Sequence, residues 1–184
     1  DHRDLHLSIR RQRQMCIRDR SQTHIVGALK INGAGIVSST RIRSLIREGD
    51  VESASKLLGR EYSIRGTVEH GAHRGAGLGF PTANISPSNQ IIPAKGVYVA
   101  EVCIGRNLRH AVVNVGVNPT FGEDTLRIEA HLMDFKGDLY GDTIEVRFID
   151  RIRHEQRFSS VEELTKQIGC DVETVRTFFK RRTQ

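Results

Sequence analysis

The segment of this chain most suited to chemistry runs from Gly71 to Asn84 and reads GAHRGAGLGFPTAN. Its first nine residues include four glycines, at positions 71, 75, 77 and 79. Glycine lets the backbone approach a ligand closely, and successive N–H groups can bind phosphate oxygens. The segment lacks the GxxxxGK spacing of a P-loop, and Pro81 prevents a helix from following it. On the glycines alone, a flexible hairpin loop is the favoured interpretation.

Two polar side chains follow these glycines. Pro81 fixes its own φ and biases the preceding residue toward extended geometry, so the chain enters a strand here. In a strand, Thr82 and Asn84 point to the same side. A hydroxyl and an amide oxygen are hard, neutral donors that magnesium accepts when phosphates complete its coordination shell. The alternative is that both side chains bond only to local backbone.

Glu129 is the second candidate for chemistry, because it lies within an alternating segment on the face opposite Ile128 and Ala130. A carboxylate in that position faces either solvent, which is the usual case, or a cleft. In a cleft, it could accept the proton of a substrate hydroxyl. His131 shares this face but has no partner at metal-ligand spacing, so we interpret it as structural or peripheral.

The elements that must position these residues are short strands. The segment 97–104 is continuously apolar, as expected for a strand covered on both faces, whereas 127–135 and 143–149 alternate. Many short strands joined by Gly, Pro, Asn and Asp loops predict a mainly β fold, a closed antiparallel barrel. The predicted strands are 62–68, 97–104, 110–115, 127–135 and 143–149.

Helices are predicted on both sides of the strands. Over 36–59 we expect a hairpin of two short helices, the first capped by Ser39 and ended by Gly49, the second capped by Asp50 and ended by Gly59.

At the other end of the chain, the serines and glutamates of 159–163 have capping-box spacing and predict the start of a helix. We expect Gly169 to end this helix and Asp171 to cap a last one. The apolar stripes of both helices predict packing on the barrel rather than a partner-binding surface. These stripes consist of Val161, Leu164 and Ile168, and of Val172, Val175, Phe178 and Phe179.

The net charge of +6 is unevenly distributed along the 184 residues. Residues 1–20 carry +3, residues 21–60 carry another +3, and residues 61–184 hold 16 basic and 16 acidic side chains. A nucleic-acid binder usually carries its excess charge on the folded recognition module. We therefore expect no nucleic-acid partner.

Residues 1–35 differ in character from the rest of the chain, and MCIRDR at 15–20 resembles translated sequencing-adapter sequence. We expect a disordered or artefactual tail; the alternative is a basic nucleic-acid arm. No apolar run has the length of a membrane helix or a secretory signal. Three distant cysteines without a CxxC spacing fit a reducing compartment, so we expect a cytoplasmic protein without a membrane partner.

Several motifs, in family order, resemble riboflavin kinase (flavokinase). The motifs are GFPTAN at 79–84, GVY at 96–98, NVGVNPTFG at 114–122, IEAHLMDF at 128–135, DLYGD at 138–142 and IRHEQRFSSVEELTKQIGCD at 152–171. The preceding stretch, VSSTRIRSLIREGDVESASKLLGREY, resembles the end of a bacterial FMN adenylyltransferase module. The resemblance divides the chain into a tail at 1–35, a helical remnant of that module at 36–60 and a riboflavin kinase domain at 61–184.

The resemblance implies a six-stranded Greek-key barrel that phosphorylates the riboflavin 5′-hydroxyl with ATP and releases FMN and ADP. Glu129 would be the general base, and the glycine loop would close over the nucleotide. By family pattern, ATP would be bound by Gly71, Arg74, Gly75, Gly79, Thr82 and Tyr140, Mg²⁺ by Thr82 and Asn84, and the flavin by Arg153 and Phe158.

The chain departs from the family pattern in two places. Ala76 stands where members often carry a second basic residue, which leaves Arg74 as the basic residue between the loop glycines. No HxGH motif of the adenylyltransferase is present, so we expect the chain to make FMN but not FAD.

Two other functions remain as alternatives. A non-catalytic flavin-binding barrel would have no use for Thr82, Asn84 and Glu129 together. A nucleic-acid-binding barrel would need surface aromatics in a basic groove, but aromatic residues make up only 5% of the chain.

Overall fold

The structure is a computed structural model, and it describes residues 27, 29–31, 35–71, 74–88, 91–117 and 126–182. The chain divides into two compact units, Asp1–Lys30 and Ile31–Gln184. Strands β1 (Lys30–Ile31) and β2 (Gly35–Ile36) form a separate two-stranded sheet. The expectation of a disordered or artefactual tail at 1–35 falls mostly outside the described residues and stays a prediction.

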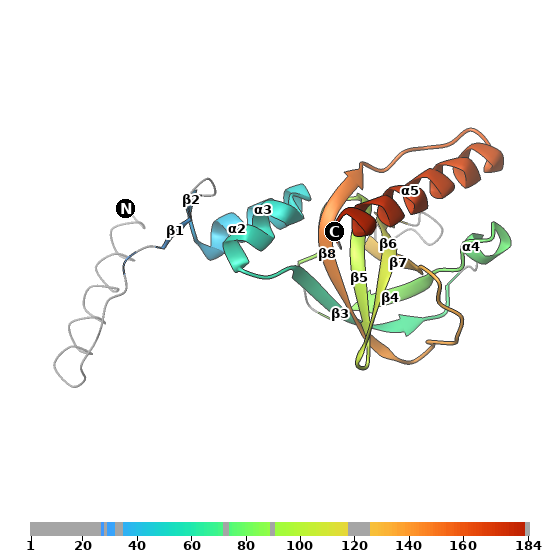
Figure 1. Cartoon of the computed structure of the whole chain (residues 1–184), viewed down its shortest axis with the longest axis horizontal. Helices are drawn as coiled ribbons and strands as arrows, with labels where there is room; N and C mark the ends of the chain where they lie inside the picture. Colours follow the sequence, from blue (N-terminus) through green and yellow to red (C-terminus); the bar gives the residue numbers. More distant parts are fainter. Residues whose placement is uncertain are drawn as a thin grey trace, which may run out of the picture. The chain divides into compact units, whose positions relative to one another are not determined.

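Six antiparallel strands close into a barrel in the second unit, which confirms the predicted fold class (Figure 1). The order around the barrel is β3-β4-β7-β6-β5-β8, and β8 pairs with β3 to close it. Strands β5, β6 and β7 form a meander, and β8 returns to lie beside β5, which is a Greek key. The strands are β3 (Tyr62–Glu69), β4 (Ala83–Pro87), β5 (Gly96–Ile104), β6 (Asn107–Val117), β7 (Leu126–Leu132) and β8 (Thr143–Arg153).

The alternation in the sequence decides which side chains fill the barrel. Ile128, Ala130 and Leu132 of β7 point inward, and so do Ile144, Val146 and Phe148 of β8. Strand β5 is covered on both faces, as predicted, because Tyr98, Ala100 and Val102 lie inside the barrel and Val97 and Val99 outside.

Strand β7 is shorter than the predicted 127–135. It ends at Leu132, and the chain then turns at Asp134, whose φ is +53°. Asp is among the residues that tolerate this left-handed conformation.

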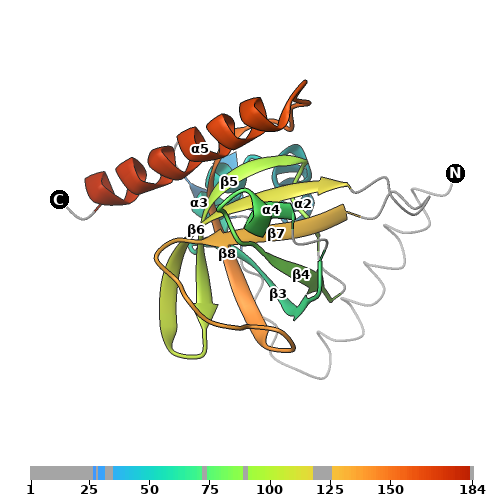
Figure 2. The same ribbon diagram turned by 90° about the vertical axis from the view of Figure 1, so that its right-hand side faces the viewer.

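The C-terminal region is one continuous helix, α5 (Val161–Arg182), so the prediction of two helices was wrong. A glycine inside a helix costs about 1 kcal/mol, and Gly169 is such a residue. The apolar stripe nevertheless continues across Gly169 and packs on the outside of the barrel over β5 and β6, which outweighs that cost (Figure 2). The stripe consists of Ile168, Val172, Val175 and Phe179.

The start of α5 agrees with the predicted capping box. Ser160 Oγ accepts the backbone N–H of Glu163 at 3.2 Å, and the Glu163 carboxylate accepts the N–H of Ser159 at 3.2 Å. Val161 is 59% exposed, so the prediction that it belongs to the packed stripe was wrong.

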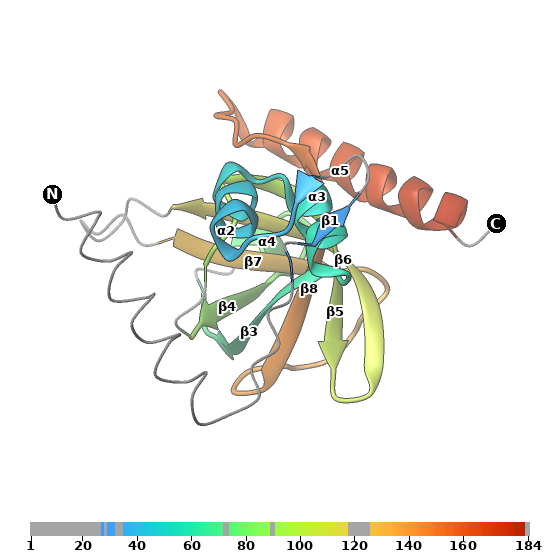
Figure 3. The ribbon, with the colours of Figure 1, turned by 90° about the vertical axis from the view of Figure 1, so that its left-hand side faces the viewer.

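The helical hairpin consists of α2 (Ser39–Glu48) and α3 (Val51–Leu58). Ser38, rather than the predicted Ser39, caps α2, because Ser38 is extended and its hydroxyl accepts the Arg41 N–H. Asp50 caps α3, and Gly49 and Gly59 end the two helices at φ +80° and +71°, as predicted. Helix α3 lies against β8 and β3 (Figure 3).

No helix among the described residues is long and apolar enough to cross a membrane.

Candidate functional site

Asn84, Glu129 and Asn114 are register partners on the neighbouring strands β4, β7 and β6. Directly opposed side chains of an antiparallel pair have Cβ atoms about 4.5–5.5 Å apart. The flanking residues Ile128 and Ala130 are fully buried inside the barrel, so the three polar side chains lie on its outer face. All three are partly buried. The predicted general base therefore lies between two amides.

The same register extends across all six strands. Glu69 of β3 is opposite Asn84, and Val97 of β5 is opposite both Asn114 and Arg153 of β8. Residues that the sequence analysis assigned to different ligands thus lie along one line. We call this line the register row; in order, it is Glu69, Asn84, Glu129, Asn114, Val97 and Arg153.

Residues 74–80 of the glycine segment fold into a closed turn, which we call the glycine turn. It contains a single helical turn, α4 (Arg74–Gly77), and the Gly75 carbonyl accepts the N–H groups of Leu78 at 3.1 Å and Phe80 at 2.8 Å. Gly79, at φ +85°, has the left-handed conformation that favours glycine. The backbone of Arg74 is part of this turn.

Close packing accounts for two of the glycines. A Cβ atom on Gly71 would overlap the side-chain amide of Asn84, and one on Gly75 would overlap the Phe80 carbonyl and lie 3.3 Å from Thr82 Oγ1. The glycine segment therefore packs against Thr82 and Asn84. A side chain at Gly75 would displace the backbone of the turn, and one at Gly71 would displace the Asn84 side chain.

Thr82 and Asn84 fit a cation that also binds phosphate oxygens. Thr82 lies just before β4, and the intervening Ala83 packs against the barrel core, so the two polar side chains share the outer face. Both lie against the glycine turn. The described residues include no group of three or more His, Cys, Asp or Glu side chains that could hold a metal ion. Such a cation would thus depend on these neutral oxygens and on its ligand's phosphates.

Tyr140 lies beside the glycine segment. Its ring stacks on His70, the neighbour of Gly71, with 3.9 Å between centroids and 24° between planes. The segment that carries Tyr140 is bonded to β3, because the Gly141 N–H donates to the Val68 carbonyl at 3.0 Å. Tyr140 is 39% exposed, so part of the ring remains accessible. The sequence analysis missed His70, for which its position next to the first glycine was the available signal.

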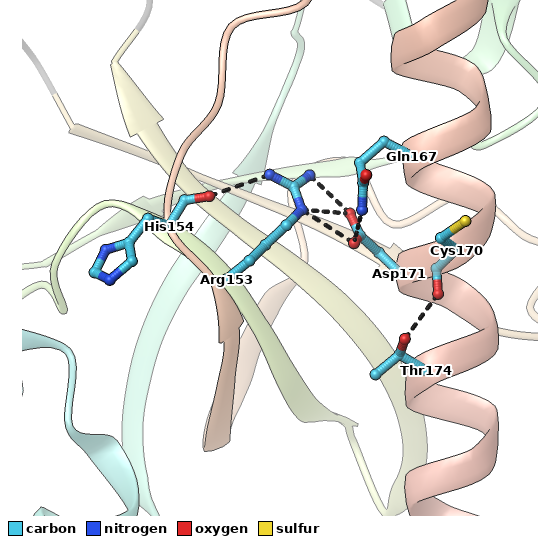
Figure 4. A network of polar contacts seen from close by, with 6 residues as sticks. All are labelled: Arg153, His154, Gln167, Cys170, Asp171 and Thr174. Atoms are coloured by element: carbon cyan, nitrogen blue, oxygen red, sulfur yellow. Dashed lines mark hydrogen bonds and ion pairs between the residues drawn. The ribbon is translucent and has the colours of Figure 1, made fainter.

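Arg153 and Phe158 lie together at the other end of the register row. The Arg153 guanidinium carbon is 5.7 Å from the centroid of the Phe158 ring. The guanidinium donates to both carboxylate oxygens of Asp171 on α5, with Nη2 2.8 Å from Oδ2 and Nε 3.0 Å from Oδ1 (Figure 4). The expectation that Asp171 caps a last helix was wrong, because its carboxylate pairs with Arg153.

Gly116 on the outer face of β6 and Glu155, which follows β8, are two further residues that the sequence analysis missed. Gly116 is two positions from Asn114, and a Cβ atom on Gly116 would lie 2.9 Å from Glu155 Oε1 and 3.5 Å from Asn114 Nδ2. Gly116 thus leaves space that the Glu155 carboxylate reaches.

His131 has the structural role expected of it. Its Nδ1 lies 2.9 Å from the Pro81 carbonyl, and its ring contacts Phe80 edge to face. It anchors the end of the glycine segment on β7.

In the part of the chain that the structure describes, two cavities lie away from the register row. One of about 640 Å³ lies between Arg47 of α2 and the segment 91–95, and one of about 470 Å³ lies between α3 and the end of α5. Neither is lined by Asn84, Glu129 or Arg153. The site residues are brought together by strand register and by the packing of the glycine turn.

Known proteins resemble this chain in sequence and in fold. The family model Flavokinase, described as riboflavin kinase, matches residues 58–179. The chain belongs to the riboflavin kinase family. The flavokinase match contains the whole barrel, the glycine turn and most of α5, and α2 precedes it.

Two curated relatives carry the name bifunctional riboflavin kinase/FMN adenylyltransferase. The Bacillus subtilis protein is 40% identical over 147 residues, which are 78% of this chain and 46% of the relative. The Escherichia coli K12 protein is 40% identical over 160 residues, which are 86% of this chain and 49% of the relative. The chain thus spans about half the length of the curated relatives it matches.

A solved structure from Streptococcus pneumoniae has a similar fold, with a TM-score of 0.77 and 42% identity over 83% of this chain and 50% of that chain. That structure is named a macrolide-efflux protein. The name differs from those of the curated relatives, and the family assignment follows the flavokinase match and those relatives.

Proposed function

We propose that this chain transfers a phosphoryl group from ATP to the 5′-hydroxyl of riboflavin, which yields FMN and ADP. The observation that carries the proposal is the position of Glu129 in the register row. On one side of it lies Asn84 under the glycine turn, and on the other the row leads to Arg153 beside Phe158. This reaction requires a base that lies between the site that binds the phosphates and the site that binds the flavin.

The phosphate-binding end is the glycine turn. The backbone of Gly71, Gly75 and Gly79, with Arg74, would surround the phosphates of ATP. Tyr140, which is 39% exposed, would contact the nucleotide. Thr82 and Asn84 would hold Mg²⁺ through neutral oxygens. When bound with the triphosphate, the ion neutralises charge that develops on the transferred group.

The flavin-binding end consists of Arg153 and Phe158. A planar guanidinium and an aromatic ring in contact provide flat surfaces of the kind that pack against a fused ring system. The isoalloxazine ring would lie here, with its ribityl chain directed along the register row toward Glu129.

In the reaction, the Glu129 carboxylate would accept the proton of the 5′-hydroxyl while that oxygen forms a bond to the γ-phosphorus of ATP. The bond between the γ-phosphorus and the β–γ bridging oxygen breaks, and ADP leaves with that oxygen. The protein's part is mainly to position the reactants, because phosphoryl transfer needs alignment and charge stabilisation more than covalent chemistry.

Mass spectrometry of riboflavin incubated with ATP, magnesium and the purified chain tests this function. We expect riboflavin to gain one phosphoryl group, and to gain none when ATP is omitted. Riboflavin binding without phosphoryl gain would contradict the proposal and favour a non-catalytic flavin-binding barrel. The same assay, started from FMN, checks the expectation that this chain does not make FAD.

A further inference from the structure

Asp171 of α5 is the one buried charged side chain among the described residues, and only 3% of it is exposed. It accepts three hydrogen bonds from Arg153, two from Nε at 3.0 and 3.2 Å and one from Nη2 at 2.8 Å (Figure 4). Gln167, one helical turn earlier, donates Nε2 to Oδ1 of the same carboxylate at 2.9 Å.

This arrangement fixes the guanidinium of Arg153 in one orientation. Nε and Nη2 are directed at α5, and Nη1 donates to the His154 carbonyl at 3.2 Å. The side chain of Arg153 is only 16% exposed. A planar fork held on both sides cannot turn freely, so its position relative to Phe158 is set by the carboxylate.

Contacts other than this ion pair also hold α5 on the barrel. The helix is already held by Val172, Val175 and Phe179 against the outer apolar cluster of the barrel. Arg176 also pairs with Asp134 at 3.5 Å. A buried ion pair is by itself weak evidence for stability, because removing two charges from water opposes the gain from their attraction.

We propose that Asp171 is a positioning residue for riboflavin: it acts through Arg153, whose guanidinium it holds beside Phe158 at the flavin-binding end of the register row. This inference rests on the proposed function, since it takes Arg153 and Phe158 as flavin contacts. It makes α5 part of the flavin site, although the helix contributes no flavin contact of its own through Asp171.

Three measurements on the full chain test the proposal. Riboflavin binding is measured by quenching of flavin fluorescence, and steady-state kinetics and thermal unfolding are measured on the same variants. Asp171→Asn removes the charge and keeps the shape. We expect the riboflavin Kd and KM to rise about tenfold, as for loss of a charge-assisted hydrogen bond, with the KM for ATP unchanged. Unchanged riboflavin constants, or an equal rise in both KM values, would overturn the proposal.

If Asp171→Asn does not fold, the Gln167→Leu variant tests the proposal, because it leaves the ion pair intact and removes one of the two hydrogen bonds to Oδ1. We expect it to raise the riboflavin Kd about two- to fivefold without an effect on the KM for ATP. An unchanged riboflavin Kd in the folded variant would reject the positioning role.

Asp134→Asn is the matched control. It removes a different ion pair of α5, the one between Arg176 and the segment after β7, and Asn tolerates the left-handed φ of +53° at this position. We expect its riboflavin Kd to equal that of the parent. A parent chain that does not bind riboflavin would refute the proposed function, whereas a defect in Phe158→Ala but not in Asp171→Asn would refute only this inference.

Discussion

Asn84 of β4 and Glu129 of β7 are directly opposed across an antiparallel pair, and the amide of Asn84 is packed under Gly71. Asn84 thus links the glycine segment to the Glu129 carboxylate, because it contacts Gly71 on one side and is opposite Glu129 on the other. A change at the turn is therefore transmitted to Asn84, and Asn84 adjoins the group proposed to take up the substrate's proton.

The carboxylate of Glu129 is the first group to test. Glu129→Gln keeps the size of the side chain but cannot accept a proton, so we expect kcat to fall about 10²- to 10⁴-fold, as for loss of a general base. Riboflavin and ATP binding should persist. Steady-state phosphorylation assays measure the effect, with Glu101→Gln on β5 as the control, and parent-like turnover of Glu129→Gln would contradict the assignment.

Asn84→Ala removes one proposed magnesium ligand. We expect the magnesium concentration for half-maximal rate to rise about tenfold, equivalent to roughly 1.4 kcal/mol of binding. Ser86→Ala, two residues along the same face of β4 and exposed, should leave the magnesium titration unchanged. Coincident titrations for Asn84→Ala and the parent would exclude Asn84 as a ligand.

Gly71→Ala should disturb the turn without changing any polar group. The added methyl would overlap the Asn84 amide, so we expect kcat/KM for ATP to fall about 10- to 100-fold from misplacement of the site. Gly77→Ala is the control in the same turn, because a Cβ atom there meets nothing within 4 Å. Equal kinetics of the two variants would show that the seating of the turn on Asn84 is unimportant.

The ion pair between Glu61 and Arg182, with 3.1 Å between its charged atoms, joins the start of β3 to the end of α5. The backbone N–H of Glu61 and the Arg182 guanidinium hold the pKa of this carboxyl below its ordinary value of 4.5. A lowered carboxyl pKa contributes stability above the ordinary pKa, and that contribution is lost as the pH falls through the lowered value.

Glu61→Gln should therefore reduce the free energy of unfolding at neutral pH by less than about 1 kcal/mol, since the pair is partly exposed. The difference from the parent should shrink as urea unfolding is repeated at pH values that fall further below 4.5. In a double-mutant cycle, Arg182→Gln should cost nothing further once Glu61 is replaced. A difference that stays constant with pH would contradict this account.

Local patterns in the sequence were sufficient for much of the fold. Alternation identified the inward faces of β7 and β8, and the continuous apolar run identified β5 as a strand covered on both faces. Gly49, Asp50 and Gly59 marked helix ends correctly, because capping depends on the backbone and side chain of a few consecutive residues. Residue type and spacing marked the glycine segment and Glu129 as candidates, but the resemblance to riboflavin kinase supplied their proposed roles.

The tertiary structure decided which of these residues meet. Alternation shows the face on which Asn84, Glu129 and Asn114 lie, but strand register makes them neighbours, and register depends on pairing between distant segments. The same applies to Asp171. Local spacing predicted a helix cap, whereas packing of α5 across the barrel makes the helix continuous through Gly169 and brings the carboxylate to Arg153. A buried carboxylate is stabilised by the cation that the fold places beside it, and that partner lies on another element of the chain.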